Sequence, residues 1–172
     1  MNHHFKEIVF SLIDLENPPN LALHPRNSVF GVSTIRNTAV WAPSKRHDAI
    51  LGLILLWHDH WAESHAITQT HEGVRDFDLL HAIGHRREGD YGNASYWFQA
   101  VGEHPMFGNL SARIEDSFKK DVDLLGKILP EKKWNPTAFV GLVKGDPQNS
   151  DLRSIQAIEM HCFLDFLISG AA

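Results

Sequence analysis

The sequence predicts an all-α protein, a single helical domain spanning 1–172 and made of about seven helices in stacked antiparallel hairpins. Apolar residues recur every three to four positions over most of the chain, which is the spacing of amphipathic helices. Sustained alternation typical of a strand is missing, and residues 29–34 are the only strand candidate. Short turns separate the helical stretches, which favours antiparallel neighbours.

The first predicted helix covers residues 4–15 and ends at the Pro18-Pro19 pair. Residues 20–43 show no helical pattern, and a loop of this length is unusual in a small domain. Two explanations stay open at this point. A short helical turn could lie within 28–34 or 38–42, or part of the loop could cover a site.

The centre of the chain is predicted to form two helical hairpins. Their helices cover 45–57, 61–70, 76–88 and 92–102. Ser44 is placed to cap the first of these helices and Asp59 the second. Gly89 is expected to end the third helix in a conformation that a β-carbon disfavours, and Asp90 to cap the fourth.

The C-terminal third is also predicted to be helical. Its helical stretches cover 110–129, 135–143 and 151–168. Pro130 ends the first stretch, and Pro136 lies in the first turn of the second, where proline is tolerated. Ser150 is expected to cap the last helix, whose apolar face docks into the core.

Bulk composition excludes several classes of protein. The net charge of -5 and the pI near 6.1 argue against a nucleic-acid-binding surface. The longest apolar run, 50–57, is too short to span a bilayer, and we see no N-terminal signal sequence. The single Cys162 excludes an internal disulfide and fits a reducing compartment. We therefore expect a cytoplasmic protein with a small molecule or a peptide as partner.

The second hairpin resembles a tetratricopeptide-type repeat. Gly89-Asp90-Tyr91 stands at the inter-helix turn of that pattern, with Ala94, Phe98 and Pro105 at its later positions. The first helix departs from the pattern, because histidines 81 and 85 stand where large apolar residues are usual. Such arrays need about three units for stability. We therefore expect stacked helical hairpins and not a true repeat protein.

A more specific resemblance rests on a longer signature. It comprises His85-Arg86-Arg87-Glu88-Gly89-Asp90-Tyr91, Asn93, Tyr96-Trp97-Phe98, Gly102 and His104-Pro105, together with Trp57-His58-Asp59 and Glu63-Ser64-His65 upstream. With this signature, residues 50–107 resemble an uncharacterised family of bacterial and fungal proteins. The resemblance implies an architecture and no reaction.

The predicted helix 76–88 carries a row of ionisable side chains. Asp78, His81, His85 and Glu88 fall within an arc of about 80° beside the apolar face. Two histidines four residues apart and a carboxylate one turn on, namely His81, His85 and Glu88, could bind a divalent metal. The row could equally line a pocket for a non-metal polar ligand. It could also consist only of helix-terminal charges and polar-face histidines.

Neighbouring residues complete the predicted site. Asp59 and Glu63 lie four residues apart and, with His65, could face this row if the hairpins stack. Arg86 at the helix C-terminus suits the helix dipole, and Arg87 is expected to pair with a carboxylate such as Asp90 or Glu63.

These observations predict a binding or scaffold protein. Its polar cleft would lie between residues 57–69 and 77–90 and would take a small ligand or a peptide. The alternative is a metal-dependent enzyme, hydrolytic in type, that uses His81 and His85. Whether the protein is an enzyme, and whether it is an oligomer, stays open from sequence.

Overall fold

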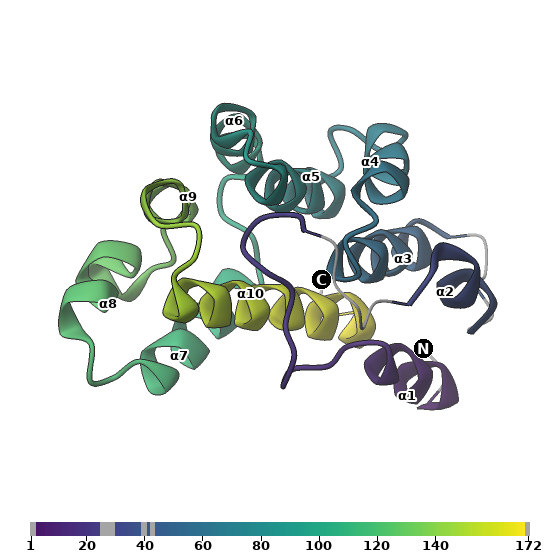
Figure 1. The fold of residues 1–172 in the computed structure, drawn as a ribbon, viewed down its shortest axis with the longest axis horizontal. Coiled ribbons are helices and arrows are strands. Elements are labelled where there is room, and N and C mark those ends of the chain that lie inside the picture. Colours follow the sequence, from purple (N-terminus) through teal and green to yellow (C-terminus); the bar gives the residue numbers. More distant parts are fainter. Residues whose placement is uncertain (1–2, 25–29, 39–40, 42–43, 171–172) are drawn as a thin grey trace.

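The computed structural model describes residues 3–24, 30–38, 41 and 44–170. Within these residues the chain forms ten α-helices and one short 3₁₀-helix, and no strand (Figure 1). The predicted all-α class is confirmed, whereas the predicted number of about seven helices is too low. The helices are α1 (His3–Ser11), α2 (Val32–Thr38), α3 (Lys45–Trp57), α4 (Trp61–Gln69), α5 (Arg75–Glu88), α6 (Tyr91–Val101), α7 (Phe107–Ser117), α8 (Val122–Ile128), η1 (Pro130–Lys132), α9 (Pro136–Gly145) and α10 (Ser150–Ser169).

Two regions account for the additional helices. The stretch 110–129 is not one helix: α7 ends at Ser117, and α8 begins after Asp121, whose side chain accepts a hydrogen bond from the Leu124 amide at 3.0 Å. This N-cap starts a new helix where the apolar pattern alone continues. Helix α2 lies in the long loop and overlaps the strand candidate. Residues 28, 29, 39, 40 and 42 of the proposed helical turns lie outside the described residues.

Local capping signals were predicted with mixed success. The Ser44 side chain accepts from the His47 amide, and Asp90 accepts from the Asn93 amide, as predicted. Gly89 ends α5 with a φ of 91°, in the left-handed region. In contrast, Asp59 does not cap α4, because its carboxylate pairs with Arg87 instead. The last helix is capped by Asn149, one residue before the predicted Ser150.

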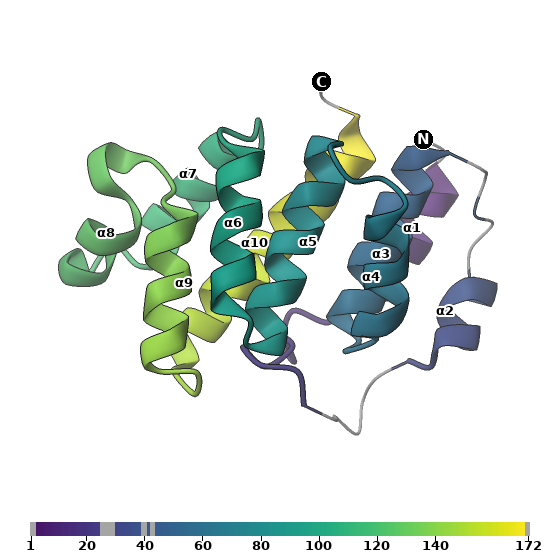
Figure 2. The ribbon, with the colours of Figure 1, turned by 90° about the horizontal axis from the view of Figure 1, so that it is seen from above.

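The helices form a row crossed by one long helix. Figure 2 shows α9, α6, α5, α4 and α3 side by side, and Figure 1 shows α10 running beneath them. Helices α7 and α8 lie at one end of the molecule, and α1 and α2 lie at the other. In the described residues we find no transmembrane candidate, since no helix there has both the necessary length and the necessary apolar run.

Helices α3 and α5 form the centre of the core. Every α3 residue from Ala49 to Trp57 is buried, and so is every α5 residue from Phe77 to Arg87. The two helices approach closely at Gly52, where an added β-carbon would lie 2.7 Å from the Leu80 side chain. Because α5 is buried on all sides, its polar residues must find partners inside the protein.

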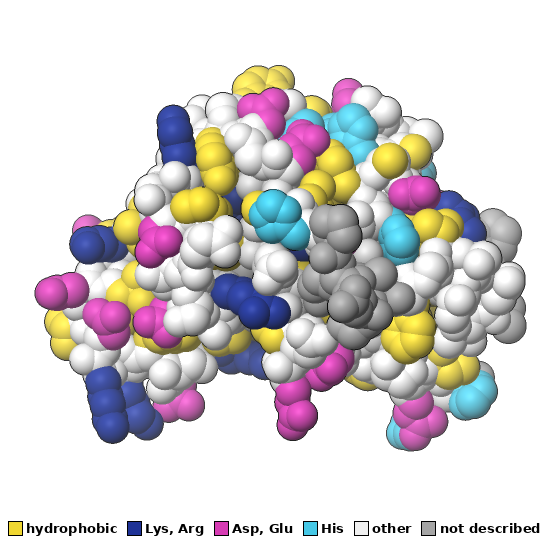
Figure 3. All heavy atoms as spheres, viewed as in Figure 1, with side chains coloured by type: hydrophobic (Ala, Val, Ile, Leu, Met, Phe, Trp, Pro, Cys, Tyr) yellow, Lys and Arg dark blue, Asp and Glu magenta, His cyan; other side chains and the backbone are white. Residues whose placement is uncertain are grey.

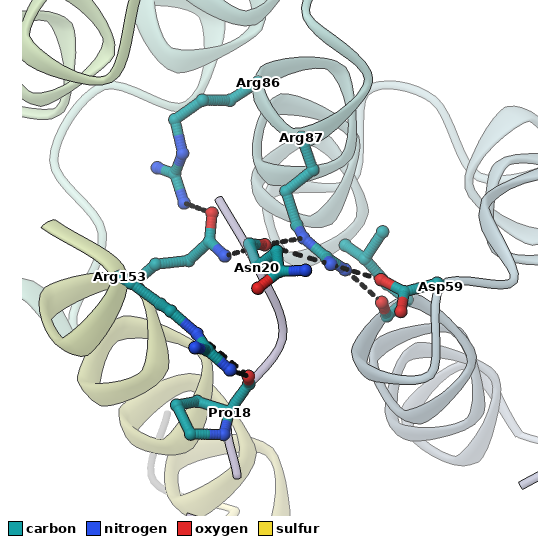
Figure 4. Close-up of polar contacts among 8 residues, drawn as sticks. Pro18, Asn20, Asp59, Arg86, Arg87 and Arg153 are labelled. Atoms are coloured by element: carbon teal, nitrogen blue, oxygen red, sulfur yellow. Dashed lines mark hydrogen bonds and ion pairs between the residues drawn. The ribbon is translucent and has the colours of Figure 1, made fainter. Parts of the chain in front are cut away.

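A segment that we call the N-terminal strap, residues 18–23, is bound to α5 and α10 (Figure 4). Arg153 donates to the Pro18 carbonyl, and the Asn20 carbonyl accepts from Gln156 at 3.0 Å and from Arg87. The Leu23 amide donates to the Arg87 carbonyl at 2.8 Å. The strap is therefore held through its backbone.

Candidate functional site

Three imidazole rings meet between α4 and α5. His65 comes from α4, and His81 and His85 come from α5, four residues apart on one helix face. The ring of His81 lies 4.7 Å from each of the other two, and those two lie 5.5 Å apart, measured between centroids. One ring nitrogen from each residue lies within 4.8 Å of the others. We call His65, His81 and His85 the histidine cluster.

Two tryptophans enclose the histidine cluster. Trp97 of α6 stacks on His81, with centroids 4.4 Å apart and planes inclined by 21°. Trp61 of α4 lies 4.7 Å from the His65 ring and 5.3 Å from the His85 ring. Trp61 can lie this close to α5 only because residue 84 is glycine, where an added β-carbon would lie 1.9 Å from the indole. Side-chain packing thus holds the three imidazoles close together.

His81 is the most unusual member of the cluster. Only 2% of its surface is exposed, and this burial, together with His85 and His65, lowers its pKa to about 4. Burial, and then the proximity of His85, also lowers the pKa of His65. His81 is therefore neutral at pH 7, which is the state that binds metals. Neither of its ring nitrogens has a hydrogen-bond partner in the part of the chain that the structure describes.

Glu88 supports His85 from the next turn of α5. Its carboxylate accepts from Nδ1 of His85 at 2.5 Å and from the Trp61 indole N–H at 2.6 Å. Because Nδ1 carries the proton in this arrangement, Nε2 of His85 keeps its lone pair. The side-chain amide of Asn93 lies 3.1 Å from that Nε2. Glu88, which is 31% exposed, connects the cluster to the surface.

The surface view agrees with this position. Figure 3 shows histidine and acidic side chains close together at the top of the molecule, over the α4–α6 region.

The structure brings together only some of the four ionisable side chains that were predicted to form a row along α5. His81 and His85 meet, but the third close histidine is His65, and Glu88 instead groups with His85 and Asp90. Asp78 lies elsewhere, where it accepts a hydrogen bond from the Gly73 amide at 3.0 Å. The row was expected at a flank open to solvent or a cleft. Asp78, His81 and His85 are instead buried, and α6 covers His81 with Trp97 and contacts His85 through Asn93.

The remaining predicted site residues contact other groups. Arg87 forms an ion pair at 2.5 Å, so the predicted pairing with a carboxylate is confirmed, but the partner is Asp59 and not Asp90 or Glu63. Arg86 is fully buried and pairs with Glu159 of α10 at 2.5 Å. Glu63 is half-buried on α4 and is not one of the clustered groups. Both arginines therefore connect elements of the fold.

The sequence did not predict the side chains that surround the histidine cluster. Trp61, Trp97 and Asn93 were not among the predicted site residues. A signal for Trp61 was present in its spacing, because it precedes His65 by four residues, as His81 precedes His85. The contribution of Trp97 depends on how α6 packs on α5, and no local pattern contains that information.

Known proteins give no further guidance. A comparison of this chain with protein families, curated proteins and solved structures found no match. The resemblance to an uncharacterised bacterial and fungal family therefore stays a prediction.

Proposed function

We propose that this protein is a helical ligand-binding protein and that the histidine cluster is its binding site. One observation carries the proposal: His81 is buried, and both of its ring nitrogens lack a hydrogen-bond partner in the described residues. A buried unsatisfied polar group costs about 1–3 kcal/mol. A phenylalanine would fill the same space at lower cost, so the imidazole is best explained by something that binds to it.

The proposed framework for this site is a pair of stacked hairpins of the tetratricopeptide type, α3–α4 and α5–α6. Supporting this, α3 packs on α4, α4 on α5, and α5 on α6. The small residues Gly52, Ala82 and Ala94 are buried in these helices. A cytoplasmic location is part of the proposal, and the free, buried Cys162 fits it.

Replacing His81 by phenylalanine tests the proposal. In protein dialysed against a chelator, His81→Phe is expected to raise the free energy of unfolding by about 1–3 kcal/mol, because it removes an unsatisfied polar group. Urea denaturation measures the change.

His104→Phe is the matched control. His104 is equally buried, but its Nε2 lies 2.9 Å from Asp76 and its Nδ1 accepts from the Met106 amide. This control should lower stability, because it removes two hydrogen bonds. A loss of stability in His81→Phe as large as that in His104→Phe would show that His81 has a structural role, and the proposal would fail.

A metal-dependent hydrolase is the second candidate function. It is favoured by the partly exposed carboxylate of Glu88 beside the cluster, where a general base could act. Three nitrogen ligands with one open position are typical of catalytic zinc sites. Hydrolysis of activated esters and phosphoesters in the presence of Zn²⁺, abolished in Glu88→Gln, would support it, whereas equal rates in both proteins would exclude it.

A further inference from the structure

The histidine cluster leaves little room for an organic ligand. Both ring nitrogens of His81 are closed off from solvent. Trp97 covers one face of the ring, and His85 stacks at 4.7 Å with planes inclined by 19°. An organic molecule would have to displace these rings before it could form a hydrogen bond with His81. A bare ion needs only the space between the nitrogens.

We infer that the histidine cluster binds one divalent transition-metal ion, through one ring nitrogen each of His65, His81 and His85. This inference rests on the proposed function and names its ligand. Metal–imidazole bonds measure about 2.0–2.1 Å, so two ligand nitrogens on a tetrahedral ion lie about 3.4 Å apart. The three nitrogens already lie within 4.8 Å of one another. Reaching that spacing takes ring movements of about an ångström, in which the stacked rings of His81 and His85 also turn so that one nitrogen of each points at the ion.

The donor set selects the class of ion. Imidazole nitrogen suits zinc, copper, nickel and cobalt, whereas magnesium and calcium require oxygen ligands. All three ligands contribute neutral nitrogen, and the nearest carboxylate, that of Glu88, is engaged by His85 and Trp61. Zn²⁺ and Co²⁺ are expected to bind, and Mg²⁺ is not.

Glu88 is a positioning residue in this arrangement and not a ligand. Its hydrogen bond from Nδ1 of His85 leaves Nε2 to face the ion, and such carboxylates increase the basicity of the ligand. The Trp61 indole fixes the other carboxylate oxygen. Asn93, whose amide nitrogen now lies 3.1 Å from Nε2 of His85, is the group that the ion displaces.

Titration of the full chain with Co²⁺ and Zn²⁺ tests the inference. Since His3 and His4 near the N-terminus can bind metals themselves, every variant carries His3→Gln and His4→Gln. After dialysis against a chelator, we expect one equivalent of Co²⁺ with the visible absorption of a tetrahedral site, displaced by Zn²⁺ and unaffected by Mg²⁺.

Single variants assign the ligands. His65→Phe, His81→Phe and His85→Phe should each weaken binding by at least about 100-fold, because one of three protein ligands is lost. His71→Gln, which changes a histidine paired with Asp48 outside the cluster, should leave the affinity unchanged. Glu88→Ala should weaken binding by about 10–100-fold. Glu88→Gln keeps an acceptor for Nδ1 and should recover part of that loss.

The outcomes separate this inference from the proposed function. If no transition metal binds but His81→Phe still increases stability, the metal assignment fails and the binding proposal stands. If Co²⁺ binds equally well to His81→Phe, the ion lies elsewhere and the inference is overturned. If Glu88→Ala binds Co²⁺ as tightly as the parent protein, Glu88 has no positioning role. If His81→Phe lowers stability and no metal binds, both proposals fail.

Discussion

Gly84→Ala tests the packing that builds the site. A β-carbon at this position would lie 1.9, 2.4 and 2.6 Å from three carbons of the Trp61 indole, so the ring must move. Overpacking of this kind costs about 1–3 kcal/mol. The moving indole also loses its hydrogen bond to the Glu88 carboxylate, which adds about 1.5–3 kcal/mol. Alanine regains about 1 kcal/mol through helix propensity. The net loss of stability is thus about 1.5–5 kcal/mol.

Urea denaturation of Gly84→Ala measures this loss, and Gly141→Ala is its matched control. Gly141 lies in the exposed part of α9, and an added β-carbon there meets nothing within 4 Å. The control should gain up to about 1 kcal/mol from helix propensity alone. If Gly84→Ala were as stable as Gly141→Ala, Trp61 would not lie against α5, and the enclosed histidine cluster would be refuted.

Three further predictions follow from buried groups and backbone geometry. Arg86→Met leaves Glu159 buried and unpaired and should lower the free energy of unfolding by about 3–5 kcal/mol, as measured by urea denaturation. The double variant Arg86→Met with Glu159→Leu should recover most of that stability, and an equal loss in both variants would contradict the ion pair. Gly89→Val should lower stability by about 1–3 kcal/mol through strain at a φ of 91°, and an unchanged melting temperature would exclude this turn. The pKa of His81 is lowered to about 4, so the unfolded chain binds more protons between pH 6.5 and 4 and stability falls as the pH drops through that window. His81→Phe should remove that part of the pH dependence, which denaturation at several pH values measures, and an unaltered profile would contradict the lowered pKa.

The pH dependence of metal binding follows from the same groups. The charges that act on the cluster are those of His65, His85, Glu88 and Glu72. An unperturbed histidine near pKa 6.5 would lose metal as the pH falls through that value. Because burial keeps His81 neutral to about pH 4, protons compete with the metal at His81 only at lower pH.

Features encoded by neighbouring residues could be predicted from the sequence. Ser44, Gly89 and Asp90 each act on the backbone within a few residues, so their capping roles follow from residue type and position. The break before α8 was missed because the apolar spacing on both sides is helical, and the cap at Asp121 competes with that pattern.

The site could be predicted only where it lies on one helix. His81 and His85 were recognised because four residues make one turn of α5. The role of His65 depends on the angle at which α4 crosses α5, and that crossing depends on Gly84. The pairing of Arg87 with Asp59 likewise depends on tertiary packing and not on sequence spacing.

The buried arginines explain how α5 can present histidines in a fixed orientation. Arg87 lies about 160° around the helix from His85, and it engages Asp59 together with carbonyls of α3 and the N-terminal strap. Arg86 engages Glu159 of α10. Buried ion pairs contribute little net stability, but they are costly to break, so they resist rotation of the helix. Because these contacts hold α5 in place, the helix backbone that carries His81 and His85 toward α4 and α6 is preorganised, as a binding site requires.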